Sequence, residues 1–208
     1  MSTNPILLST AFLPPSGWFS LLLKHPVTIE KYENYQRQTY RNRCLIYSEK
    51  GILPISVPVN RPSGNHTPIT EVRIFNNEKW YQKQWRAIRS AYEASPFFLY
   101  YQDDLKPFFN GYSGNLFHYN HSLILKLCEL MEISPDLHFT TKFEKEPVTM
   151  TDLRRFFSPK KQTPGHFPAY TQVFSDRHGF IPNLSILDVL FNLGPESKDY
   201  LVQITLSY

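Results

Sequence analysis

A chain of 208 residues has the size of one ordinary domain, and no repeat, low-complexity run or Gly/Ser-rich linker divides it, so we expect a single domain over 1–208. The net charge of +4 favours anionic ligands but is too small to indicate a nucleic-acid-binding protein. Two distant cysteines without CxxC spacing argue against disulfide frameworks and zinc sites, and neither a signal peptide nor an apolar run of roughly 20 residues appears, so we expect a cytoplasmic protein without a membrane span.

The first half of the chain alternates short apolar runs with turn residues. Such runs, bounded by proline, glycine and polar clusters, predict strands, whereas apolar residues spaced by three and four predict a helix. By these patterns we expect, in order, a strand at 7–12, a short helix at 18–24, a strand at 27–30, a hairpin with arms at 44–48 and 53–59, and a strand at 69–75. Asn76 and Asn77 are expected to cap an amphipathic helix at 79–93.

The second half predicts two further helices. One covers 119–131 and is entered through Asn120 as a possible cap, and a strand at 137–143 follows it. The last helix follows 182–185, carries an apolar stripe from Ile186 to Leu193 and is closed by Gly194-Pro195. This alternation of strands and helices predicts an α/β fold with a mixed, mostly parallel sheet and flanking helices, with α+β as the alternative.

Residues 30–43 form the most unusual segment, because nearly every side chain there can donate or accept a hydrogen bond. Three arginines provide planar donor forks that suit phosphate or carboxylate, and three tyrosines provide flat faces and hydroxyls. This combination suits a phosphorylated or sugar-bearing ligand. The alternative is a solvated connection whose arginines pair with Glu30 and Glu33.

The residues before and inside the last helix allow two interpretations. Asn183 or Ser185 can cap the helix, with Asp188 in its first turn completing the capping arrangement. The amide groups of the same helix end can also hold an anion. Tyr170 and Gln172 alternate along what looks like a preceding strand and are expected to point to one side.

Two other groups of residues have side chains that suit chemistry or binding. His118 and His121 lie three residues apart, where either suits a general base, although a structural role is the commoner outcome. The basic stretch 154–161 suits contact with an anionic polymer, with an exposed, solvated loop as the alternative.

Four stretches of the chain carry a resemblance to a bacterial family. They are Phe12-Leu13-Pro14 through Gly17-Trp18-Phe19, the segment 30–43 ending in Tyr-Arg-Asn-Arg, the stretch 80–101 with its Ser-Ala-Tyr and Ser-Pro-Phe-Phe, and 170–195. The last stretch contains Gly-Phe-Ile-Pro-Asn-Leu-Ser-Ile-Leu-Asp at 179–188, a long and specific string. Over nearly its whole length the sequence therefore resembles the WbqC-like protein family.

The resemblance implies an association with bacterial surface-polysaccharide genes and a transferase role on nucleotide-linked amino sugars, but it brings no established catalytic residues. We therefore expect a transferase that moves an acyl or aminoacyl group to a nucleotide-linked amino sugar. The substrate is then a small molecule, and we expect the enzyme to use no metal or other cofactor. A noncatalytic binding protein for a sugar nucleotide, RNA or a protein partner is the alternative.

Roles in the expected site follow from side-chain chemistry. Glu33 or His121 acts as the base that takes a proton from an amine. The expected substrate-binding residues are Arg37, Arg41 and Arg43 for a diphosphate, Tyr35 and Tyr40 for a ring, Asn42 and Asn183 for sugar hydroxyls, and Gln172, Ser185 and Asp188 beside them.

Overall fold

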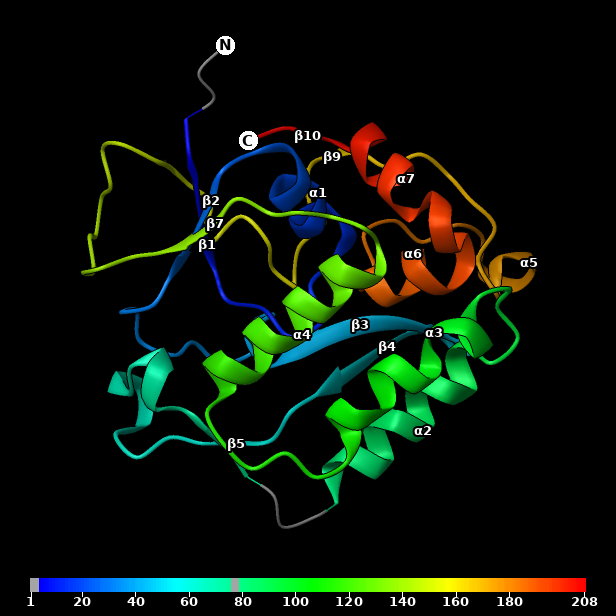
Figure 1. Ribbon diagram of the computed structural model, residues 1–208, viewed down its shortest axis with the longest axis horizontal. Coiled ribbons are helices and arrows are strands. Elements are labelled where there is room, and N and C mark those ends of the chain that lie inside the picture. Colours follow the sequence, from blue (N-terminus) through cyan, green and yellow to red (C-terminus); the bar gives the residue numbers. More distant parts are fainter. Residues whose placement is uncertain (1–3, 76–78) are drawn as a thin grey trace.

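A computed structural model describes residues 4–75 and 79–208. Within these residues the largest sheet has four parallel strands in the order β7 (Leu137–Phe139), β2 (Val27–Glu30), β1 (Ile6–Ser9) and β8 (Thr151–Asp152). Figure 1 labels the first three of these strands. Every residue of β1 is buried, as its apolar run predicts. Because the strands are parallel, their carboxyl ends meet at one edge of the sheet.

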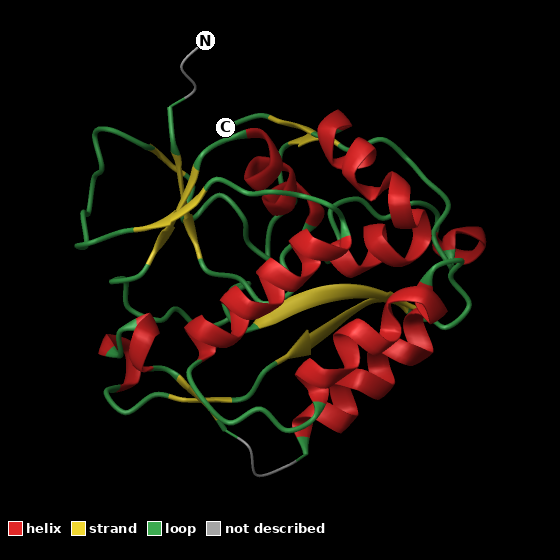
Figure 2. Cartoon of the chain, viewed as in Figure 1, coloured by secondary structure: helices red, strands yellow, loops and turns green. Residues whose placement is uncertain are grey.

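The expected hairpin forms a sheet of its own. Its arms β3 (Arg43–Ser48) and β4 (Gly51–Ser56) pair antiparallel from Arg43 opposite Ser56 to Ser48 opposite Gly51. Gly51 adopts a φ of 92°, which the tight turn requires and glycine accepts without strain. The α/β class with flanking helices is thus confirmed, and the hairpin lies beside the parallel sheet instead of joining it (Figure 2).

Two smaller strand pairs complete the sheets. They are β5 (Val59–Asn60) with β6 (Arg73–Ile74), and β9 (Gly165–His166) with β10 (Thr205–Leu206). The segment 69–75 was expected to be one strand, but it forms a 3₁₀ turn at Ile69–Glu71 before β6. Only two residues of that segment therefore form a strand, which pairs with β5.

Helices cover the hairpin and the parallel sheet. Helix α1 (Ser16–Lys24) packs against α6 (Ile186–Leu193) and α7 (Ser197–Gln203), and α6 also contacts β3. On the other side of the hairpin lie α2 (Trp80–Tyr92) and α3 (Phe98–Leu105), while α4 (Leu116–Leu130) runs across it in Figure 1. A short helix, α5 (Ser175–His178), lies at the end of the hairpin, and further 3₁₀ turns occupy Gly64–His66, Lys106–Phe109 and Gly194–Glu196.

Helix boundaries differ from expectation at one informative place. Helix α4 begins at Leu116, and the side chain of Asn115 caps it by accepting from the backbone N–H of His118 at 3.2 Å. Asn120, expected as the cap, is instead fully buried within the helix and donates to the carbonyl oxygen of Arg41 at 2.8 Å. That expectation was wrong because the polar Asn120 serves a tertiary contact, not a helix end. The expected caps Asn76 and Asn77 lie outside the described residues.

Aromatic side chains fill the core between these layers. Phe191 of α6 contacts the rings of Phe98 at 5.1 Å and Tyr92 at 5.3 Å, measured between ring centroids. Trp18 and Phe19 of α1 are buried as well. Such rings contribute large apolar contact areas per side chain, so α1, α2, α3 and α6 share one core. Among the helices in residues 4–75 and 79–208, none combines the length and apolarity that crossing a bilayer demands.

Candidate functional site

The carboxyl edge of the parallel sheet gathers polar side chains that are distant in sequence. Ser9 ends β1 opposite Glu30 at the end of β2, and Asp152 ends β8. In α/β proteins, ligands bind outside the carboxyl ends of parallel strands. A cavity of about 720 Å³ lies at this edge, and we call it the sheet-edge cavity. Its charged lining residues, among those that the structure describes, are Glu33, Arg37, Arg41, Lys145, Glu146, Asp152, Arg154 and Arg155.

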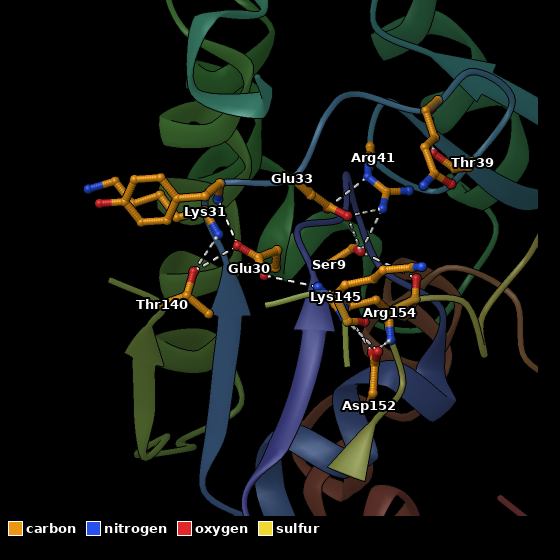
Figure 3. A network of polar contacts seen from close by, with 12 residues as sticks. Ser9, Glu30, Lys31, Glu33, Thr39, Arg41, Thr140, Lys145, Asp152 and Arg154 are labelled. Atoms are coloured by element: carbon orange, nitrogen blue, oxygen red, sulfur yellow. Dashed lines mark hydrogen bonds and ion pairs between the residues drawn. The ribbon is translucent and has the colours of Figure 1, made fainter. Parts of the chain in front are cut away.

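A buried ion pair forms one wall of the sheet-edge cavity. Arg41 donates from Nε to Oε1 of Glu33 at 2.9 Å and from Nη2 to Oε2, and both side chains are about 5% exposed or less (Figure 3). Nη2 of Arg41 also donates to Oγ of Ser9 at 2.7 Å. The Ser9 hydroxyl in turn donates to Oε2 of Glu33 at 3.1 Å. Of the alternative, a solvated connection whose arginines pair with Glu30 and Glu33, the structure shows the Arg41–Glu33 pairing, but the pair is buried and it borders the cavity.

Arg154 forms a second fixed guanidinium beside the first. It donates from Nε to Oδ1 of Asp152 at 2.9 Å, from Nη1 to Oε2 of Glu30 at 3.1 Å and from Nη2 to the carbonyl oxygen of Lys145 at 3.1 Å. Glu30 is fully buried and also accepts from the Thr140 hydroxyl at 2.8 Å. Against the effect of burial, the hydrogen bonds and charge of Arg154 lower the pKa of Asp152. Both guanidinium groups are therefore held in place by carboxylate side chains before any ligand arrives.

The charge of the sheet-edge cavity is positive. Its described lining has five basic side chains and three acidic ones, and Arg37, Lys145 and Arg155 are exposed at its mouth. In the described part of the chain, no ion pair involves these three residues. Tyr35, which is buried, contributes a ring over which the Arg61 guanidinium lies at 5.7 Å. Burial raises the pKa of Tyr35, although nearby arginines oppose the rise, so its hydroxyl remains a hydrogen-bond donor.

A second cavity, of about 570 Å³, lies against the hairpin, and we call it the hairpin cavity. It is bordered by Leu45 and Ile52 of the hairpin, by 159–163 and 165–167, and by 180–184. Tyr40 and Asn183, both expected in the site, line this cavity instead of the first. Asn183 accepts from the backbone N–H of Gly17 at 2.8 Å and donates to Thr163 Oγ1 at 2.8 Å, so it holds the amino end of α1.

The residues expected around the last helix form a buried polar cluster. Ser185 caps α6 by accepting from the N–H of Leu187 at 3.4 Å and donates to the carbonyl oxygen of Leu13 at 3.0 Å. Asp188 does not complete a capping box, because its Oδ2 accepts from Tyr170 at 2.5 Å and from Gln172 at 2.7 Å.

Burial shapes the chemistry of this cluster. It raises the pKa of Asp188 to about 6, although the hydrogen bonds from Tyr170, Gln172 and Tyr92 oppose the rise. Tyr170 and Gln172 point to one side, as their alternation predicts, although the described residues form no strand there. Gln172 also borders a separate cavity of about 490 Å³ with Asn192. The cluster ties the segment 170–181 to α6.

Three further expected residues lie outside both named cavities, as far as the described residues define them. Asn42 donates to the carbonyl oxygen of Val57 at 2.8 Å and closes the open end of the hairpin. Arg43 begins β3 opposite Ser56. His121 lies on α4 against the ring of Phe139 at 5.0 Å, and burial lowers its pKa. The structure therefore brings Glu33, Tyr35, Arg37 and Arg41 together and separates them from the other expected residues.

Two residues at the carboxyl edge of the parallel sheet escape a sequence-based search. Asp152 ends a strand of two residues, too short for a periodic pattern, and Ser9 is an ordinary residue at the end of a buried strand. The basic stretch 154–161 did carry a signal. Arg154 and Arg155 line the sheet-edge cavity, while Lys160 and Lys161 line the hairpin cavity, so this stretch borders both.

Comparisons with known proteins place this arrangement in a family. A model of the WbqC-like protein family matches residues 10–158 and 160–200. The chain is similar to "Uncharacterized protein Rv1507c" of Mycobacterium tuberculosis, with 26% identity over 222 residues, covering 94% of this chain and 96% of the relative. No solved structure matches the chain. Because the family model spans most of the chain, including most of the residues that line both cavities, the protein belongs to the WbqC-like protein family.

Proposed function

We infer that the sheet-edge cavity binds a nucleotide-linked amino sugar and that the protein transfers an acyl or aminoacyl group to its amine, in the synthesis of a bacterial surface polysaccharide. One observation carries the binding part. At the carboxyl edge of the parallel sheet lies a cavity of about 720 Å³, a size that suits a small ligand. Among the residues that the structure describes, five basic and three acidic side chains line it.

The basic residues that bind the diphosphate are of two kinds, fixed and exposed. Arg41 and Arg154 are fixed by Glu33, Asp152 and Glu30, so they provide donors in set positions. Arg37 and Lys145 are exposed at the mouth and neutralise the remaining charge. Fixed donors supply orientation and flexible ones supply affinity, which is the division that a charged ligand with a defined reactive end needs.

Two further kinds of side chain suit the rest of the ligand. Tyr35 lines the cavity with a hydroxyl that can donate to a base or sugar, while its buried ring lies under the Arg61 guanidinium. Asn34 and Asn65, which also line the cavity, carry amides that can both donate to and accept from sugar hydroxyls.

The transfer itself is a substitution at a carbonyl carbon. The amine nitrogen of the sugar forms a bond to the carbonyl carbon of an activated acyl donor, the bond to the leaving group breaks, and the amine loses one proton. Glu33 is the base, because it lines the cavity, whereas His121 lies against Phe139. Within the described residues, Oε1 of Glu33 accepts one hydrogen bond, from Nε of Arg41, so its second lone pair can take the proton while Arg41 keeps its position.

Neither cysteine takes part in this reaction. Burial raises the pKa of both the Cys44 and the Cys128 thiol, so both remain protonated at neutral pH. The chemistry therefore rests on positioning and charge stabilisation.

A thermal-shift and calorimetric screen of nucleotide-linked amino sugars tests the binding. Wild type should be stabilised saturably with one ligand per chain, and Arg37→Ala should weaken binding about tenfold because one charge-assisted hydrogen bond is lost. Arg86→Ala, which removes an exposed arginine on α2, is the matched control and should bind like wild type. If no sugar nucleotide binds wild type, or if both variants bind equally, the proposal is wrong.

The same structure gives a reason to test a noncatalytic binding protein. Both oxygens of Glu33 are engaged by Arg41 and Ser9, which favours a positioning role over proton transfer. Incubating the bound sugar nucleotide with acyl thioesters and analysing the mixture by mass spectrometry separates the two functions. A mass increase equal to the acyl group, lost in Glu33→Gln, supports a transferase. Unchanged sugar with intact binding supports the binding protein.

A further inference from the structure

Two residues that are adjacent in the chain line the two different cavities. Arg41 lines the sheet-edge cavity and Tyr40 lines the hairpin cavity. A narrow hollow of about 20 Å³, bordered by Tyr40, Arg41, Ser9 and Arg154, shares lining residues with both cavities. Through Tyr40 and Arg41, the two cavities adjoin the same short segment of the chain.

The hairpin cavity differs from its neighbour in chemistry. Leu45, Ile52, Phe167 and Phe180 give it apolar walls, and Ile52 is 52% exposed, so an apolar side chain is left uncovered there. Lys160 and Lys161 are exposed at its border, and no ion pair in the described part of the chain involves them. An apolar wall with cations at one side suits a ligand that has an apolar part and an anionic part.

We propose that the hairpin cavity is the acyl-donor site and that it takes an acyl thioester with an apolar acyl chain and a phosphate-bearing carrier. The inference deepens the proposed function and rests on it for the identity of the transferred group. The acyl chain lies against Leu45, Ile52 and Phe180. The carrier's phosphate lies at Lys160 and Lys161.

The reaction then joins the groups held in the two cavities, beside Tyr40 and Arg41. The sugar's amine nitrogen, held in the sheet-edge cavity, forms the bond to the thioester carbonyl carbon, and the carbon–sulfur bond breaks. The sulfur leaves with the bonding electron pair and, overall, with the proton that the amine gives up, so the products are an amide and a free thiol. Tyr40 is buried, and burial raises the pKa of its phenol, so its hydroxyl stays protonated and able to donate to the carbonyl oxygen.

Calorimetric titration with hexanoyl-coenzyme A tests the site without any sugar nucleotide. Ile52→Asp places a carboxylate in the path of the acyl chain and should weaken binding about tenfold or more, whereas Ile52→Val should bind like wild type. Because Ile52 is exposed, the charge should leave the fold intact, which circular dichroism checks.

A second pair of variants tests the anionic end. Lys160→Ala/Lys161→Ala should weaken hexanoyl-coenzyme A and coenzyme A alike, by about tenfold, and should leave the weaker binding of hexanoate nearly unchanged. Lys83→Ala/Lys106→Ala removes the same charge from exposed lysines of α2 and the turn after α3, and should bind all three probes like wild type.

The outcomes separate this inference from the proposed function. Failure of wild type to bind hexanoyl-coenzyme A, or equal binding by Ile52→Asp and Ile52→Val, overturns the acyl-donor site even if sugar nucleotides bind. Arg37→Ala should leave thioester binding unchanged. If the thioester binds with these sensitivities while no sugar nucleotide binds, the thioester site is supported and the proposed function is the part that fails.

Discussion

Two buried carboxylates in this protein are compensated in opposite ways. Glu33 is paired with the Arg41 guanidinium beside the sheet-edge cavity, whereas Asp188 is fully buried and accepts from the neutral donors Tyr170 and Gln172. Burying a carboxylate costs free energy unless an opposite charge or hydrogen bonds replace water. The charged pair lies where a ligand can enter, and the neutral cluster lies where two segments must be joined. Burial of an acid therefore does not by itself distinguish a site from a structural cluster.

The largest effect should come from breaking the charged pair. Arg41→Ala leaves Glu33 buried without its partner, so we expect the free energy of unfolding to fall by about 3–5 kcal/mol in urea denaturation. The matched control is Arg89→Ala, whose pair with Glu93 is exposed and should contribute about 0.5 kcal/mol or less. Similar losses in the two variants would show that the buried pair has no special weight.

The cluster around Asp188 should make the free energy of unfolding depend on pH. The folded-state pKa of Asp188, about 6, lies above the ordinary value of 3.8. Wild type therefore loses stability as the pH rises through this range, because ionised Asp188 is costly to bury. Asp188→Asn stays neutral. The free energy of unfolding of the variant, relative to wild type, should rise by roughly 2 kcal/mol between pH 4 and pH 7. Urea denaturation at both pH values measures it, and parallel profiles would contradict the assignment.

A smaller loss of stability should distinguish the helix cap at Ser185 from the buried carboxyl of Asp188. Ser185→Ala removes the cap of α6 and the hydrogen bond to Leu13, which should cost about 1 kcal/mol at every pH between 4 and 7. Ser90→Ala, an exposed position in α2, should change stability by less than about 0.5 kcal/mol. A pH-dependent loss in Ser185→Ala would mean that the cap and the Asp188 cluster act as one unit.

The smallest effect on stability should come from Arg37. It lines the same cavity as Arg41 but is exposed, so Arg37→Ala should change the free energy of unfolding by less than about 0.5 kcal/mol. The urea midpoints of wild type and Arg37→Ala provide the measurement. A large loss would show that Arg37 supports the fold, and the effect of its removal on ligand binding would then need Lys145→Ala as a replacement.

Local pattern was enough to predict many of the elements. The apolar run before Pro14 contains most of β1, the expected arms at 44–48 and 53–59 overlap the two strands of the hairpin, and Ser185 caps α6. Each of these depends on residues close in sequence, because periodicity and turn or cap chemistry act over one or two turns of chain. Family membership was likewise readable from the sequence.

The site was decided by contacts that no local pattern encodes. Ser9, Glu33, Arg41 and Arg154 meet because parallel pairing brings the ends of β1, β2 and β8 to one edge, and β8 has only two residues. The neighbours Tyr40 and Arg41, which the sequence suggests as one surface, line different cavities. Side-chain type shows what a residue is able to bind, whereas strand register and long-range packing determine which residues share a cavity.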